Sequence, residues 1–206
     1  MRYALSAPER LNVIGPGGEV TVGGSQEWYA DHWHRLAGCG PTSAANILWY
    51  LARSGRRVPC ETGDGGRDDF LALMDEMFTF VTPGVRGVNS SAIFTGGIAG
   101  YAEKHGVAID SHVLEIPGRP LRRPGANEVY DFVRAAISND TPLAFLNLSN
   151  GTLVNLDNWH WVTVIGMDGD SMAADISDQG RVLTIDLAEW LRTSVLGGAL
   201  VYLTVQ

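Results

Sequence analysis

The stretch Gly38-Cys39-Gly40-Pro41-Thr42-Ser43-Ala44-Ala45-Asn46 places a cysteine between two glycines, just before a run of small and apolar residues. Pro41 suits the first turn of a helix, where a missing N–H costs nothing, and the pattern predicts a helix over about 40–54. Unpaired N–H groups and the positive end of the helix dipole stabilise a thiolate at such a position. Cys39 is therefore either a nucleophile presented by a helix or a small buried residue that closes a turn.

A histidine stands near the start of a second informative segment, Asn158-Trp159-His160-Trp161-Val162-Thr163-Val164-Ile165-Gly166-Met167-Asp168. Its aromatic and β-branched residues predict a strand that ends near Gly166. A single cysteine with a histidine far downstream is the expected arrangement for a thiol nucleophile and its base. A structural histidine at a strand end is the alternative.

An acidic residue ends the next expected strand, Met172-Ala173-Ala174-Asp175-Ile176-Ser177-Asp178, before a turn at Gln179-Gly180. Asp178 could orient the imidazole of His160 by accepting its N–H, as the third member of a catalytic triad does. Strand alternation puts Asp175 and Asp178 on opposite faces, so at most one of them faces His160. We favour Asp178; either carboxylate could instead be a solvated turn residue.

The order cysteine, histidine, aspartate resembles the papain-like cysteine peptidases, and the details look most like their bacterial C39-like branch. The similar segments are Cys39–Ala45, His160–Met167 and Asp178 with Gly180, within a region of roughly 25–200. In the acid turn the family usually has Asp-Pro, whereas here Gln179 follows the aspartate. The resemblance implies an α+β fold in which an N-terminal helical part carries the nucleophile helix and packs on a C-terminal antiparallel sheet. It also implies hydrolysis of peptide or isopeptide bonds.

The same resemblance implies a glutamine upstream of the cysteine, whose side-chain amide helps to form the oxyanion hole. Gln26 is the only glutamine before Cys39, and it lies thirteen residues away, further than is usual in the family. An insertion over Glu27–Leu36 would account for the spacing. The backbone N–H of Cys39 would be the second donor to the oxyanion.

Four further residues are predicted to contact substrate: Gly38, Gly40, Trp33 and Trp159. The two glycines leave room for a substrate backbone to come close, because they have no Cβ. The run Asp31-His32-Trp33-His34 would put two histidines on one side of an extended strand, as in some metal sites. No second Cys or His cluster has ligand spacing, so we expect no metal and no cofactor, and we place this run at the mouth of the cleft.

Composition limits the classes of partner. The chain has 206 residues and a net charge of −8, which argues against nucleic acid and mildly favours basic substrates. No apolar stretch of about 18 residues and no apolar signal segment occurs, so we expect no membrane span and a cytoplasmic location. In a reducing compartment Cys39 and Cys60 would be free thiols, Cys60 being structural. We expect an N-terminal arm over 1–25 and one domain over 26–206.

Helices are expected first along the chain and strands later, an α+β pattern. The further helices are expected near 68–78, 90–105, 126–138 and 186–193, and the strands near 107–115, 142–148, 159–167, 171–177 and 198–205. Three functions are compatible with these patterns: a cysteine peptidase, an acyltransferase or peptide-modifying enzyme with the same triad, and a non-catalytic peptide-binding module. The sequence leaves the oligomeric state open.

Overall fold

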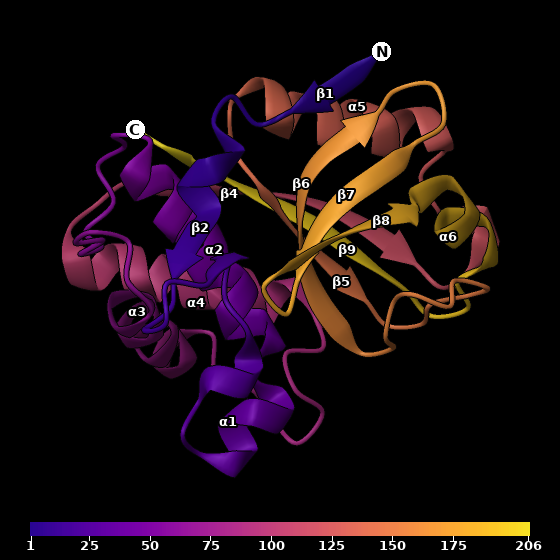
Figure 1. Cartoon of the computed structure of the whole chain (residues 1–206). Coiled ribbons are helices and arrows are strands. Elements are labelled where there is room, and N and C mark those ends of the chain that lie inside the picture. Colours follow the sequence, from indigo (N-terminus) through magenta and orange to yellow (C-terminus); the bar gives the residue numbers. More distant parts are fainter.

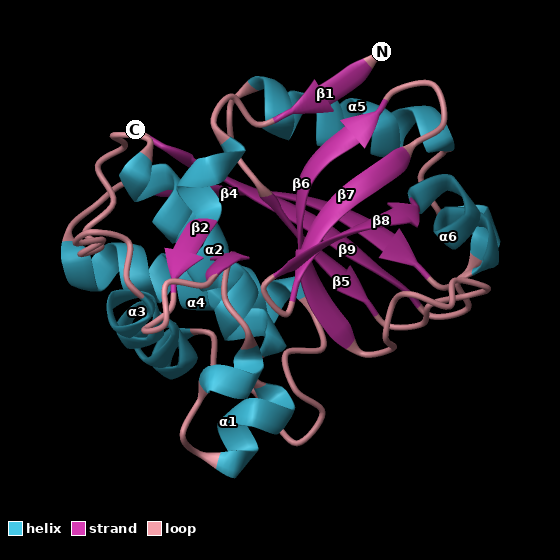
Figure 2. Cartoon of the chain, in the orientation of Figure 1, coloured by secondary structure: helices cyan, strands magenta, loops and turns pink.

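A computed structural model describes residues 1–206, in which a twisted sheet carries helices on both faces (Figure 1). The helices are α1 (His32–Ala37), α2 (Cys39–Arg53), α3 (Arg67–Phe80), α4 (Ser91–His105), α5 (Ala126–Ser138) and α6 (Leu187–Thr193). The strands are β1 (Arg2–Ala4), β2 (Asn12–Ile14), β3 (Val20–Val22), β4 (Ile109–Pro117), β5 (Leu143–Asn147), β6 (His160–Asp168), β7 (Ala173–Asp178), β8 (Arg181–Asp186) and β9 (Gly197–Val205). Figure 2 shows most helices on one side of the molecule and the large sheet on the other. This arrangement confirms the predicted α+β class, with the cysteine helix in the N-terminal helical part.

The large sheet has the strand order β4-β9-β5-β6-β7-β8, and β1 pairs with the C-terminal end of β6. Every pair in it is antiparallel. The expected strands are all present, whereas β8 was not predicted as a separate strand. Its apolar and β-branched residues, Val182–Ile185, suit a strand, and the tight turn at Gln179-Gly180 folds them back on β7.

Two apolar layers enclose the sheet. Ala144 and Leu146 of β5 belong to the core that α2, α3 and α4 form on one face, whereas Leu143 and Phe145 belong to the core that α5 and α6 cover on the other. This alternation follows from the period of two in a strand. It explains why β5 is a continuous apolar run, since both of its faces are buried.

A buried polar cluster fixes α2 against β6. The side-chain amide of Asn46 donates to Thr163 Oγ1 at 2.9 Å and its oxygen accepts from the backbone N–H of Gly24 at 2.9 Å. Ser43 Oγ lies 3.0 Å from the same Thr163 hydroxyl. Buried groups that are satisfied in this way resist sliding, because a displaced partner would remain unpaired. The cluster therefore sets the start of α2 beside the start of β6.

Residues 1–25 lie against the sheet and the helical part. β1 pairs with β6, β2 pairs with β3, and the side chains of Leu5, Leu11 and Val13 are buried. The division at residue 25 stays a prediction of the sequence. None of the helices combines the length and the apolarity needed to cross a bilayer.

Candidate active site

Cys39 is the first residue of α2 and is mostly buried. Gly38 separates it from α1, and a Cβ on Gly38 would lie 2.4 Å from both the His34 carbonyl oxygen and the Tyr29 ring. Only glycine allows the chain to pass from α1 into α2 at this point. The cysteine therefore stands at a helix start, where the first N–H groups have no partner within the helix.

Gly40 is also surrounded by the protein itself. A Cβ at this position would lie 2.8 Å from two carbon atoms of Val88, whose backbone carbonyl accepts a 2.5 Å hydrogen bond from Trp161 Nε1. The glycine thus lets the loop around Val88 pack on the start of α2. A direct contact of Gly38 or Gly40 with substrate stays a prediction.

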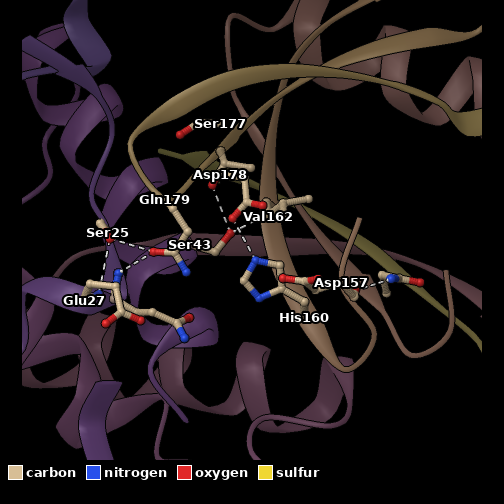
Figure 3. Close-up of polar contacts among 12 residues, drawn as sticks. Ser25, Glu27, Ser43, Asp157, His160, Val162, Ser177, Asp178 and Gln179 are labelled. Carbon is tan, nitrogen blue, oxygen red and sulfur yellow. Dashed lines mark hydrogen bonds and ion pairs between the residues drawn. The ribbon is translucent and has the colours of Figure 1, made fainter. Parts of the chain in front are cut away.

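His160 begins β6 and bridges the two other predicted catalytic side chains. Its Nε2 lies 2.8 Å from Asp178 Oδ1 (Figure 3), and its ring lines the same small cavity as Cys39. With Nε2 engaged by the carboxylate, Nδ1 is the nitrogen left for sulfur. Burial disfavours the charged ring, but the hydrogen bonds to Asp178 and Cys39 outweigh it and raise the pKa of His160 to about 10.

The two acidic candidates face different partners. Asp178 meets His160, with both side chains largely buried, whereas Asp175 pairs with Arg2 and accepts from Thr184 Oγ1 at 2.8 Å. The structure thus brings Asp178, and not Asp175, to the histidine. Strand alternation alone had left the choice between them open.

A two-residue turn explains the departure from the Asp-Pro pattern. Gln179 and Gly180 link β7 to β8 with φ of 48° and 75°, which matches a type I′ hairpin turn. Proline, whose φ is held near −65°, could not adopt this geometry. The Gln179 side-chain oxygen instead accepts from Ser25 Oγ at 2.6 Å and from the Gln26 N–H at 3.1 Å (Figure 3). This contact, which sequence reasoning missed, joins the acid turn to the segment that carries Gln26.

Gln26 lines the same small cavity as Cys39 and His160. Its Nε2 donates to the Arg35 carbonyl at 2.7 Å, and its Oε1 is buried without a hydrogen-bond partner. The residues between Gln26 and Cys39 include α1, and both ends of this segment lie at the cavity. Gln26 and Cys39 therefore line one cavity although thirteen residues separate them in the sequence. The role of Gln26 in the oxyanion hole stays a prediction.

The two tryptophans predicted to contact substrate, Trp33 and Trp159, are about half exposed and line an apolar pocket beside Cys39. Trp161, by contrast, is buried and stacks on Phe94 with 4.6 Å between ring centroids. Trp161, which follows His160 in the sequence, thus belongs to the core.

The metal site weighed for Asp31–His34 would need an extended strand, whereas this segment enters a helix. Asp31 caps α1 by accepting from the His34 N–H at 3.1 Å, so the two histidines lie on a helix rather than on one side of a strand. His34 stacks on Phe78 with 3.7 Å between ring centroids. No group of three or more His, Cys, Asp or Glu side chains comes together in a way that could hold a metal ion.

Cys60 differs from Cys39 in its surroundings. Burial, followed by the nearby carboxylates of Glu76, Asp69 and Glu61, raises the pKa of Cys60 to about 12. It has no histidine partner of the kind that Cys39 has. Cys60 is therefore a built-in reference for an unreactive thiol in the same molecule.

The raised pKa of His160 leads to a direct prediction. In protein with ¹⁵N-labelled histidine, we expect the His160 ring to stay protonated through pH 8, and Asp178→Asn to move its titration towards the ordinary value of about 6.5. Because the folded-state pKa is raised, the associated stability is fully present below about pH 6.5 and is lost as the pH rises through about 10. The free energy of unfolding of the wild type, measured in urea, should therefore fall relative to Asp178→Asn over this range. A wild-type His160 that titrates near 6.5 would contradict the bridged arrangement.

Comparison with solved structures finds chains of similar fold. The chain is similar to a solved structure described as a double glycine motif protease from an AMS/PCAT transporter in complex with the leader peptide. The TM-score is 0.43 and the sequence identity 15%, over 82% of this chain and 86% of that one. No protein-family model matches the chain, and no curated protein does. At this level of similarity, any function has to be argued from the residues of the chain itself.

Proposed function

We propose that this chain is a cysteine peptidase that hydrolyses peptide or isopeptide bonds through Cys39, His160 and Asp178. The observation that carries the proposal is the buried His160 ring, which is hydrogen-bonded to a carboxylate through Nε2 and lines one small cavity together with a helix-start thiol. This is the geometry of a nucleophile, its base and the group that orients the base. A histidine with a purely structural role would need neither a buried carboxylate nor a helix-start thiol beside its ring.

The chemistry begins with Cys39 as the thiolate and His160 as the imidazolium. The sulfur attacks the substrate carbonyl carbon, a C–S bond forms, and the carbonyl π electrons move to the oxygen. As the tetrahedral species collapses, the C–N bond breaks and His160 gives its proton to the departing amine. Asp178 holds the ring in one orientation and stabilises its charged form.

The resulting thioester is resolved by water. His160, now neutral, takes a proton from the water as its oxygen attacks the acyl carbon. The C–S bond then breaks and returns the thiolate beside the imidazolium. The Cys39 N–H and the Gln26 amide are the proposed donors to the oxyanion in both steps, because both groups belong to the cavity wall.

The test is a peptide library in ¹⁸O water, analysed by mass spectrometry. Hydrolysis by the wild type should produce new C-termini that carry ¹⁸O, Cys60→Ala should behave like the wild type, and Cys39→Ala should produce none. An added primary amine would appear in the products if the thioester were passed to an amine instead of water. New termini that persist in Cys39→Ala, or none in the wild type, would contradict the proposal.

A further inference from the structure

An apolar pocket opens on the surface directly beside Cys39. It has a volume of about 550 Å³ and is lined by Trp33, Leu36, Ala37, Cys39, Val85, Arg86, Gly87 and Trp159. Four of these are large apolar side chains that are 44%, 63%, 99% and 49% exposed: Trp33, Leu36, Val85 and Trp159. Scattered exposed apolar residues need no explanation, but a pocket of them at a candidate nucleophile points to a ligand.

One wall of the pocket is α1, and this wall is held rigidly. The Arg35 side chain donates to the carbonyls of Tyr29 and Ala30 at 2.7 Å each, and the His34 ring stacks on Phe78. Trp33 and Leu36 are three residues apart on this helix and therefore share one face. The short helix thus presents an indole and an isobutyl side chain to the pocket in a fixed position.

The opposite wall is a closed turn with Val85 and Arg86 at its tip. The backbones of Gly84 and Gly87 bond each other in both directions, at 3.2 and 2.9 Å, and the φ of Gly87 is 66°. The next residue, Val88, is tied to Trp161 and packed on Gly40. Both walls are therefore pre-formed, so that a ligand need not order them.

The pocket has one arginine, Arg86, and no carboxylate in its lining. Arg86 is exposed and takes part in no ion pair, and none of the pocket residues is acidic. Arg86 is the only Lys, Arg, Asp or Glu residue that lines the pocket. A guanidinium binds carboxylates through two parallel hydrogen bonds, and a carboxylate is the anionic group that an unmodified peptide can offer.

Trp159 forms part of the pocket in an uncommon backbone conformation. Its φ is 56°, in the left-handed region that a bulky residue rarely adopts, and it directly precedes His160. The indole remains half exposed rather than packed into the core. Backbone conformations of this kind are found where a side chain is held for a ligand.

We infer that this pocket selects substrate peptides that carry a bulky apolar side chain next to an acidic residue. The apolar side chain fills the space between α1, Trp159 and Val85, and the neighbouring carboxylate pairs with Arg86. The inference rests on the proposed function, because it assigns the pocket to the substrate of Cys39. It runs against the mild preference for basic substrates that the overall charge favours.

The experiment measures protection of Cys39 from iodoacetamide at pH 6, with Cys60 labelling as the internal reference. Three acetylated and amidated tripeptides are compared: glutamate–phenylalanine–glutamate, lysine–phenylalanine–lysine and glutamate–serine–glutamate. The symmetric design makes the result independent of the direction in which the peptide lies. We expect the first peptide to halve the labelling rate at a concentration about 3- to 10-fold lower than the second. The concentration of the first peptide that halves the labelling rate should also be at least about 10-fold lower than that of the third, because serine leaves the apolar pocket empty.

Two arginine variants decide whether the charge acts locally. Arg86→Glu should reverse the preference towards the lysine peptide, whereas Arg57→Gln, at an exposed site beyond the far end of α2, should leave it unchanged. Trp33→Ala should reduce the advantage of phenylalanine over serine. Because Arg86 is exposed and unpaired, loss of the fold is not expected to obscure the result.

The outcomes separate this inference from the function on which it rests. If Cys39 is alkylated rapidly at pH 6 but all three peptides protect equally, or none protects, the inference is overturned and the proposed function stands. If the preference survives Arg86→Glu, the assignment of the carboxylate site is wrong. If Cys39 reacts no faster than Cys60 without any peptide, the proposed function itself fails.

Discussion

Replacing His160 by alanine should slow the alkylation of Cys39 by iodoacetamide at pH 6 by roughly 10- to 100-fold. The reason is that the thiolate, not the thiol, attacks the reagent. An ordinary cysteine is about 0.3% ionised at pH 6, since its pKa is about 8.5. In the proposed pair the imidazole takes the proton of the Cys39 thiol, and the positive charge of the resulting imidazolium favours the thiolate. The lower intrinsic reactivity of such a thiolate offsets part of this gain, which is why the range is wide.

The measurement is the labelling rate of each cysteine as a function of pH, assigned by mass spectrometry. In the wild type, labelling of Cys39 should be fast well below pH 8, and in His160→Ala it should fall towards the behaviour of Cys60. Replacing His112, which contacts Thr204 on the edge of the sheet, by alanine is the matched control and should leave the Cys39 profile unchanged. Equal rates for Cys39 and Cys60 in the wild type would remove the basis for a catalytic thiol.

The second large effect is expected at Gln26. Gln26→Ala should lower kcat for a cleaved peptide by on the order of 100-fold, the usual cost of removing one donor from an oxyanion hole. The KM should change little, because the donor acts mainly on the charge that develops in the transition state. The comparison is made on a substrate identified in the peptide library.

Alkylation distinguishes this role from a structural one. Iodoacetamide reacts by displacement at a saturated carbon and forms no oxyanion, so the Cys39 labelling rate should be the same in Gln26→Ala and in the wild type. The matched control is Gln206→Ala at the exposed C-terminus. If Gln26→Ala lowers the labelling rate of Cys39 together with kcat, the role of Gln26 is structural. It would then hold α1 through its hydrogen bond to the Arg35 carbonyl and would not belong to the oxyanion hole.

Gln179 links these two predictions. Its side-chain oxygen holds the Gln26 backbone, while its own backbone forms the turn directly after Asp178. The orienting carboxylate and the proposed oxyanion donor are thus joined through one residue. In the sequence Gln179 was only a departure from the expected proline. Local patterns reveal neither its positive φ nor its contacts with Ser25 and Gln26, which lie more than 150 positions earlier.

Local sequence determined much of the fold. The helix that begins at Cys39, the strand that begins at His160 and the α5 helix were predicted to within a residue or so, because periodicity and helix-start signals act over a few neighbours. The small helix α1 was missed, because six residues rich in histidine and tryptophan carry no helical period of their own. It forms because Asp31 caps it and Phe78 receives the His34 ring.

The sequence by itself determined which residue types were present for thiol chemistry and in which elements they would lie. Only the tertiary structure decided which of them meet. Antiparallel pairing and the buried Asn46–Thr163 contact bring Cys39 to His160, and the hairpin turn aims Asp178 rather than Asp175 at the ring. The pocket with Arg86 was decided in the same way, because its walls come from three segments that no local pattern relates. Spacing along a chain constrains neighbours, whereas a site between a helix, a loop and a strand exists only once packing has placed all three.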